Sequence, residues 1–209
     1  IRDRLEMLLS IDEGLGKILD TLERTGQLDD TVVVVTSDHG YFYGEHGLNA
    51  ERRLAYEESV RIPMAIRYPR LIKAGTTIDP LTLSIDLAPT LLDIGRAEID
   101  PKLQGRSLAP LLKGEQPDDW RSSVLIEHHS DPEQYLGRSP LRRALNMGYK
   151  TVRTERYKYI QYTDLQDMDE LYDLETDPYE LENLIGKPGT ESLLENMKQE
   201  LARLLAETA

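Results

Sequence analysis

The chain has 209 residues and a formal net charge of −13, since 38 Asp and Glu residues outnumber 25 Lys and Arg residues. This acidic balance argues against nucleic acid or an anionic membrane surface as the main partner. There are no cysteines, which excludes disulfides, thiolate nucleophiles and cysteine-based zinc sites in this chain. No apolar run is long enough to span a membrane. The length allows one large domain, or one domain followed by a smaller one.

The first predicted elements are a long helix and a short, strongly apolar strand. Leucine and isoleucine recur with a helical period over residues 2–25, and Gly26 is a plausible C-cap. Because the chain begins with Ile1 inside this pattern, we expect it to be part of a longer protein. Residues 31–36 contain four consecutive valines, which predict a central strand covered on both faces, as in parallel α/β sheets.

Polar residues follow this strand directly. Ser37, Asp38 and His39 come first, and a loop with glycines at 40, 44 and 47 comes next. Open α/β sheets place their chemistry beyond the carboxyl ends of their strands, and glycine lets the backbone approach a ligand or a metal closely. The pattern therefore indicates a candidate site, with a polar turn that closes a buried strand as the alternative interpretation.

The remaining elements change in character near residue 115. Residues 62–69 read as a second strand between prolines, residues 84–93 as a helix with Ser84 and Asp86 as possible caps, and a third helix is expected from Ser107. After a polar connector, short strand-like runs and a leucine-rich helix follow, at 123–127, 149–153, 157–161, 170–173 and 190–208. We predict an α/β portion over residues 1–115, then an antiparallel sheet subdomain over residues 116–209 with a covering helix.

An ordered series of motifs resembles the type I sulfatases of the alkaline phosphatase superfamily. Residues 36–63 read TSDHGYFYGEHGLNAERRLAYEESVRIP and carry most of the resemblance. It continues in SIDLAPTLL, LQGRSL, RTERYKYI and ELYDLETDP, which begin at residues 84, 103, 153 and 170. The resemblance covers nearly the whole chain. It implies the C-terminal portion of an alkaline-phosphatase-like α/β domain with its small antiparallel subdomain.

The resemblance also implies a reaction. Type I sulfatases hydrolyse sulfate esters with a formylglycine made from Cys or Ser in a Cys/Ser-x-Pro-x-Arg motif, and a calcium ion neutralises the sulfate oxygens. The one Ser-x-Pro of this chain, at Ser130, lacks the arginine, and no cysteine is present. We therefore expect the formylglycine and half of the metal ligands in an N-terminal half that is not here. The fragment alone is expected to be inactive.

Three residues match the family's site, and a fourth candidate, His46, lies on the same loop. Asp38 and His39 match an Asp-Asn or Asp-His pair that binds calcium, although imidazole is an unusual calcium ligand, so His39 could instead contact a ligand or the ion could be another divalent metal. Arg52 stands where relatives have a sulfate-binding lysine, with Arg53 as the alternative if the register differs by one. His46 is a candidate active-site contact, or else a packed loop histidine.

Other polar clusters have structural interpretations. We read Glu57 and Glu58 as a solvated face or as a buried partner for arginine, and the tyrosine-rich residues 149–162 as cross-strand packing. His128 and His129 lack a third ligand nearby and are not taken as a metal site.

Three functions remain open at this point. The resemblance favours a sulfatase acting on a sulfated small molecule or carbohydrate, and the alternative within the superfamily is a phosphonate monoester hydrolase or phosphodiesterase. A non-catalytic fragment is the third. Without an N-terminal half, apolar strand edges would be exposed, so we expect a homo-oligomer of the fragment. The sequence indicates no cellular location.

Overall fold

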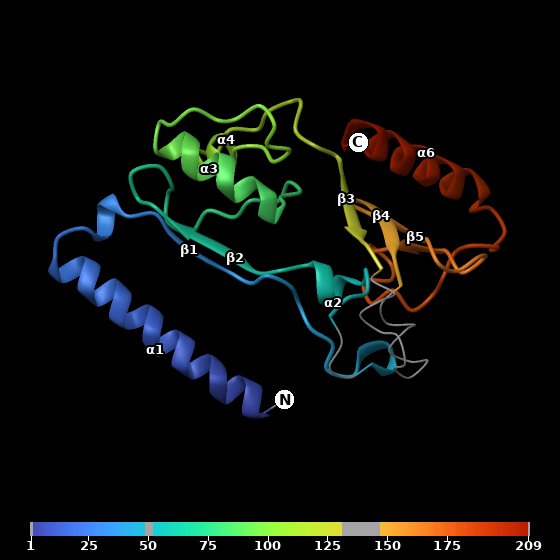
Figure 1. Ribbon diagram of the computed structural model, residues 1–209, viewed down its shortest axis with the longest axis horizontal. Helices are drawn as coiled ribbons and strands as arrows, with labels where there is room; N and C mark the ends of the chain where they lie inside the picture. Colours follow the sequence, from blue (N-terminus) through green and yellow to red (C-terminus); the bar gives the residue numbers. More distant parts are fainter. Residues whose placement is uncertain (1, 49–51, 131–146, 209) are drawn as a thin grey trace.

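The computed structural model describes residues 2–48, 52–130 and 147–208 (Figure 1). The first part contains helix α1, strands β1 and β2 and the short helices α2, α3 and α4, at Arg2–Arg24, Val33–Thr36, Met64–Arg67, Glu57–Val60, Leu87–Ile94 and Ala109–Leu112. Three 3₁₀ turns lie at Leu28–Asp30, Glu45–Gly47 and Ser84–Asp86. The second part contains strands β3 to β6 and helix α6, at Ser123–His128, Tyr149–Thr154, Tyr157–Tyr162, Glu170–Asp173 and Glu191–Thr208. Within the described residues, no helix is both long and apolar enough to cross a membrane.

Helix α1 ends at the predicted glycine. Gly26 has φ 69°, the left-handed conformation that favours glycine at this position. Its N–H donates to the Glu23 carbonyl at 2.9 Å, and the Gln27 N–H donates to the Leu22 carbonyl at 2.8 Å. These two bonds form a Schellman motif, which confirms the C-cap prediction.

The valine strand is less enclosed than the sequence predicts. Strand β1 pairs antiparallel with β2 in a two-stranded sheet, with Val34 opposite Ile66. Val35 is 43% exposed. The expectation of a central parallel strand covered on both faces is therefore wrong for the described part of this chain. The physical reason is that β2 is its single strand neighbour there, so one edge and part of one face have no covering element.

Helices α3 and α4 pack above the β1–β2 ribbon, as Figure 1 shows. Leu108, Leu111 and Leu112 form the buried cluster of this region, and Trp120 packs against it. Asp86, predicted as a possible cap, is fully buried and caps the Ser84–Asp86 turn, but its side chain makes no cap bond to α3. Its carboxylate accepts the backbone N–H groups of Leu83 and Arg106, each at 2.8 Å, and forms an ion pair with Arg121. Asp86 thus joins three separate stretches of the chain.

The second part is a four-stranded antiparallel sheet in the order β3-β4-β5-β6, with α6 across one face (Figure 1). The four strands and the helix fall where the sequence predicts them. Val152, Tyr159 and Leu171 point to α6 and contact its buried residues Met197 and Leu201. This alternation of side chains along each strand gives the sheet one apolar face for the helix.

The opposite face of this sheet is covered by a segment from the first part of the chain. Ala55 is fully buried there against Tyr149, Ile160, Tyr162 and Tyr172. These tyrosines pack across neighbouring strands, which confirms the interpretation of residues 149–162 as packing. The sheet is therefore covered on both faces, by α6 on one and by the stretch that contains Ala55 and Tyr56 on the other.

Candidate active site

Asp38 and His39 lie just beyond the end of β1. The Asp38 side chain is 86% exposed and the His39 side chain 38% exposed. Asp38 accepts the backbone N–H of His39 at 3.0 Å, and its other oxygen lies 3.6 Å from His39 Nε2. His39 Nδ1 lies 2.7 Å from the Gly40 carbonyl oxygen. The pair therefore forms an exposed corner in which a carboxylate and an imidazole nitrogen face each other.

This corner suits a divalent cation as part of a coordination shell. Carboxylate oxygens are the ligands that calcium and magnesium prefer, and imidazole suits several transition metals. Among the described residues, no three His, Asp or Glu side chains gather closely enough to hold a metal ion. Asp38 and His39 can thus supply two ligands, and any further ligands would have to come from other residues.

Gly40 joins this corner to helix α2. Its N–H donates to the Ser59 carbonyl at 2.7 Å. A Cβ atom at this position would lie 1.9 Å from the Glu58 carbonyl oxygen, so any larger residue would push the two segments apart. The glycine is required for this close approach, and it fixes the distance between the Asp38–His39 corner and the helix that follows Arg52.

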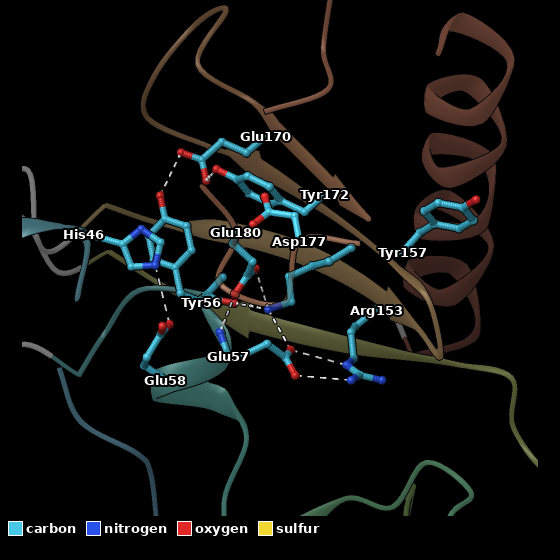
Figure 2. A network of polar contacts seen from close by, with 12 residues as sticks. His46, Tyr56, Glu57, Glu58, Arg153, Tyr157, Glu170, Tyr172, Asp177 and Glu180 are labelled. Carbon is cyan, nitrogen blue, oxygen red and sulfur yellow. Dashed lines mark hydrogen bonds and ion pairs between the residues drawn. The ribbon is translucent and has the colours of Figure 1, made fainter. Parts of the chain in front are cut away.

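His46 lies in the interior of the glycine loop. Its φ is 53°, and its side chain is 12% exposed. The ring stacks on Tyr56 with centroids 4.0 Å apart, and Nε2 lies 3.5 Å from Glu58 Oε2 (Figure 2). This geometry is that of a packed histidine. A direct contact of His46 with substrate remains a prediction.

Arg52 and Arg53 differ in exposure. Arg52 is exposed, whereas Arg53 is partly buried. The backbone carbonyl of Arg52 accepts a hydrogen bond from the Ser59 hydroxyl at 2.5 Å, which attaches the start of this segment to α2. The contact of Arg52 with sulfate, and Arg53 as its alternative, stay predictions.

Three tyrosine hydroxyls converge on Glu170, a cluster that the sequence analysis missed. Tyr56 and Tyr172 each lie 3.1 Å from the Glu170 carboxylate, and Tyr162 lies 3.4 Å away. Burial raises the pKa of Glu170 above its usual value despite these hydrogen bonds. The period-two alternation of β6 places Glu170 and Tyr172 on one face, but only the packing of Tyr56 completes the cluster (Figure 2).

A second buried cluster surrounds Lys158, which is completely inaccessible to solvent. Its Nζ lies 2.8 Å from both Glu57 Oε1 and Glu180 Oε1 and donates to the Ala55 carbonyl at 3.0 Å. Arg153 also pairs with Glu57, at 3.2 Å. Burial raises the pKa of Glu57, but Lys158 and Arg153 together bring it below its usual value. The prediction that this glutamate is a buried partner for arginine is confirmed.

Most of the chain, from residue 44 onward, matches the model of one enzyme family. Residues 44–207 match the family described as N-sulphoglucosamine sulphohydrolase, C-terminal. Residues 1–82 also match a family described as a protein of unknown function. The chain belongs to the sulfatase family of the alkaline phosphatase superfamily, as the motifs from residue 36 onward predict.

One relative and two solved structures are similar over nearly the whole chain. An N-acetylglucosamine-6-O-sulfatase from Bacteroides thetaiotaomicron is 38% identical over 100% of this chain and 35% of its own length. A solved structure in complex with its substrate D-glucosamine-2-N,6-O-disulfate superposes with a TM-score of 0.87, at 34% identity, over 96% of this chain and 39% of that one. A phosphonate monoester hydrolase from Silicibacter pomeroyi gives 0.83, at 29% identity, over 95% and 39%. The chain thus spans less than half of each of these proteins.

Proposed function

We propose that this chain is the C-terminal part of a metal-dependent sulfatase that hydrolyses a sulfate ester on an amino sugar. The observation that carries the proposal is the placement of Asp38, His39 and Arg52. The first two form an exposed corner, and the Gly40–Ser59 bond joins that corner to the helix attached to Arg52. The sugar is inferred from the relative named as an N-acetylglucosamine-6-O-sulfatase and from the neighbour solved with a disulfated glucosamine.

The candidate residues divide into two roles in this proposal. Asp38 and His39 would bind the divalent cation, which when bound supplies positive charge next to the sulfate oxygens. Arg52 would donate charge-assisted hydrogen bonds to the sulfuryl group through its planar guanidinium. The formylglycine nucleophile would come from residues outside this chain, so the 209-residue chain by itself would release no sulfate.

The test is sulfate release by the complete protein that carries this chain. We expect hydrolysis of 6-O-sulfated N-acetylglucosamine, followed by ion chromatography of the free sulfate, and loss of that activity after treatment with a chelator. The 209-residue chain, assayed at the same concentration, is the matched control and should show no release. A complete protein that leaves every sulfated amino sugar intact would contradict the proposal.

A second candidate is a phosphonate monoester hydrolase, which the similarity to the Silicibacter pomeroyi enzyme supports. Sulfate monoesters and phosphonate monoesters present similar oxygens to a cation and an arginine, and this part of the site does not separate them. The two candidates differ in kcat/KM measured side by side on a sulfated amino sugar and on an aryl phosphonate monoester. A preference for the phosphonate by more than about tenfold, or about 1.4 kcal/mol in the transition state, would favour the second candidate.

A further inference from the structure

Lys158 occupies an unexpected place for a lysine. It lies in strand β5 with no exposed surface, on the same sheet face as Ile160 and Tyr162. Removing an ammonium group from water is costly unless its donors are all satisfied, and replacement of such a buried ion pair by apolar residues is often neutral or stabilising. Stability alone therefore does not account for a lysine at this position.

The partners of Lys158 indicate what it does. An ammonium has three donors, and here it faces three oxygens, on Ala55, Glu57 and Glu180. Two of these three partners belong to the stretch Arg52–Val60 (residues 52–60), which lies about a hundred positions earlier in the chain. The lysine in the sheet thus binds residues 52–60 through one backbone carbonyl and one carboxylate side chain.

The strand pairing gives a reason for the ion pair between Lys158 and Glu57. Lys158 lies directly opposite Arg153 across β4 and β5, and like charges at such positions repel each other. Glu57 inserts its carboxylate between them, 2.8 Å from Lys158 Nζ and 3.2 Å from Arg153 Nη2. Figure 2 shows Glu57 pointing from α2 toward Arg153. The two cations therefore require the carboxylate of residues 52–60 between them.

Two further contacts fix residues 52–60 from the same side. The backbone N–H of Glu57 donates to Glu180 Oε2 at 2.6 Å, and the Tyr56 hydroxyl donates to Glu170 at 3.1 Å. Both acceptors lie in the C-terminal part of the chain. Residues 55–57 thus have a carbonyl, an N–H and two side chains fixed by the four-stranded sheet and the loop after it.

This fixed stretch connects both halves of the candidate site. Before it, the Arg52 carbonyl is hydrogen-bonded by the Ser59 hydroxyl at 2.5 Å. After it, the Ser59 carbonyl accepts the Gly40 N–H at 2.7 Å, next to Asp38 and His39. A shift of α2 would therefore change the positions of both Arg52 and the Asp38–His39 corner.

We infer that Lys158 is a positioning residue of the sulfatase site, acting through the Ala55 carbonyl and Glu57 to set Arg52 against Asp38 and His39. In this inference the C-terminal sheet is the rigid support that sets the position of Arg52. This inference rests on the proposed function for its catalytic consequence, but the attachment of residues 52–60 is a property of the described chain.

Three variants of the complete protein test the inference. Lys158→Met keeps the unbranched side chain up to the position of Cε and removes the ammonium group with its donors. Lys158→Met combined with Glu180→Gln removes one charge of each sign, which restores the charge balance of the cluster while the Ala55 carbonyl still lacks its donor. Leu201→Ala is the matched control, because it opens the core between α6 and the sheet without touching residues 52–60.

Two measurements are made on each variant at a temperature where it is folded. We expect amide hydrogen exchange of residues 52–60 to accelerate in both Lys158 variants, beyond what their global stability explains, and kcat/KM for the sulfate ester to fall by about 10²-fold, as a misplacement near 1 Å would cause. The double variant should recover stability but not kcat/KM. Leu201→Ala should lose stability with kcat/KM within about twofold of wild type.

The opposite results would overturn the inference. Recovery of kcat/KM in the double variant, or an equal loss in Leu201→Ala, would make Lys158 a merely structural residue. If Lys158→Met does not fold, the charge-balanced double variant carries the test alone. A wild-type protein that hydrolyses no sulfate ester would contradict the proposed function, whereas unchanged exchange of residues 52–60 in the Lys158 variants would contradict the positioning role by itself.

Discussion

Helices α1 and α6 are both amphipathic, yet they differ in how much of their apolar face is buried. Helix α6 buries Met197, Leu201 and Leu204 against the four-stranded sheet. Helix α1 is longer and buries no residue, and its Leu9 and Ile11 are 62% and 64% exposed (Figure 1). The difference shows that the C-terminal region covers one face of its sheet with its own helix, whereas the first region keeps apolar surface that the described residues leave uncovered. The candidate site lies where these two regions meet.

The largest expected effect concerns an exposed residue of the first region. Asp38→Ala in the complete protein should lose the bound cation, because one carboxylate fewer leaves too few oxygen ligands. Activity should then fall by about 10³-fold or more, while thermal stability without metal stays nearly unchanged because the side chain is 86% exposed. Metal content by mass spectrometry and kcat/KM are the measurements. Full activity with the metal retained would contradict the role of Asp38.

One leucine-to-alanine substitution in each helix tests how differently α6 and α1 are packed. Leu201→Ala in α6 should lower the free energy of unfolding of the chain by about 2–5 kcal/mol, because it leaves a cavity in a packed core. Leu9→Ala in α1 should change it by less than about 0.5 kcal/mol, since that side chain is mostly exposed. Urea denaturation of both variants tests the pair. Equal losses would mean that α1 is packed after all.

Variants of Arg52 and Arg53 test which of the two arginines contacts the sulfate. Arg52→Ala in the complete protein should leave the cation bound and reduce kcat/KM by about two to three orders of magnitude, or about 2–4 kcal/mol. Arg52→Lys should recover a good part of this loss, because a lysine occupies the position in relatives that the resemblance implies. Arg53→Ala is the matched control and should do much less. The reverse pattern would shift the register by one residue.

The uncovered surface of the first region leads to a prediction about association. The 209-residue chain should form oligomers in a concentration-dependent manner, because α1 exposes Leu9 and Ile11 and β1 has an unpaired edge within the described residues. Leu9→Glu with Ile11→Glu should weaken the association, whereas Arg24→Glu in the last turn of α1, which changes the charge by the same amount, should not. Light scattering over a range of concentrations decides, and a clean monomer at every concentration would refute this prediction.

The smallest expected effect is a pH dependence in the second region. The folded-state pKa of Glu170 is raised by burial, so its contribution to stability is fully present below the unfolded value, near 4.3, and is lost as the pH rises through the folded value. Glu170→Gln should therefore flatten the decline of the free energy of unfolding as the pH is raised above the unfolded value. Denaturation curves across this range test it, with Glu175→Gln on the exposed turn after β6 as the control.

The sequence by itself determined the local elements and the family. Arg2–Arg24 form a helix and Tyr157–Tyr162 a strand because the spacing of their apolar residues is a local property of the chain. The position of Asp38 and His39 after a strand also followed, since a strand ends where its β-branched run ends. The motif series from residue 36 identified the sulfatase family for the same reason, because it lies in consecutive residues.

Only the tertiary structure decided which polar side chains are buried and which groups they bind. The strand pattern of residues 157–162 gives Lys158 a face, but the sequence does not say that Ala55 and Glu57 cover that face from about a hundred positions away. It likewise gave β1 an apolar character without showing that β2 is its single neighbour among the described residues. Burial depends on contacts between distant segments, and hydrogen bonds and charges can be assigned only after those contacts are known.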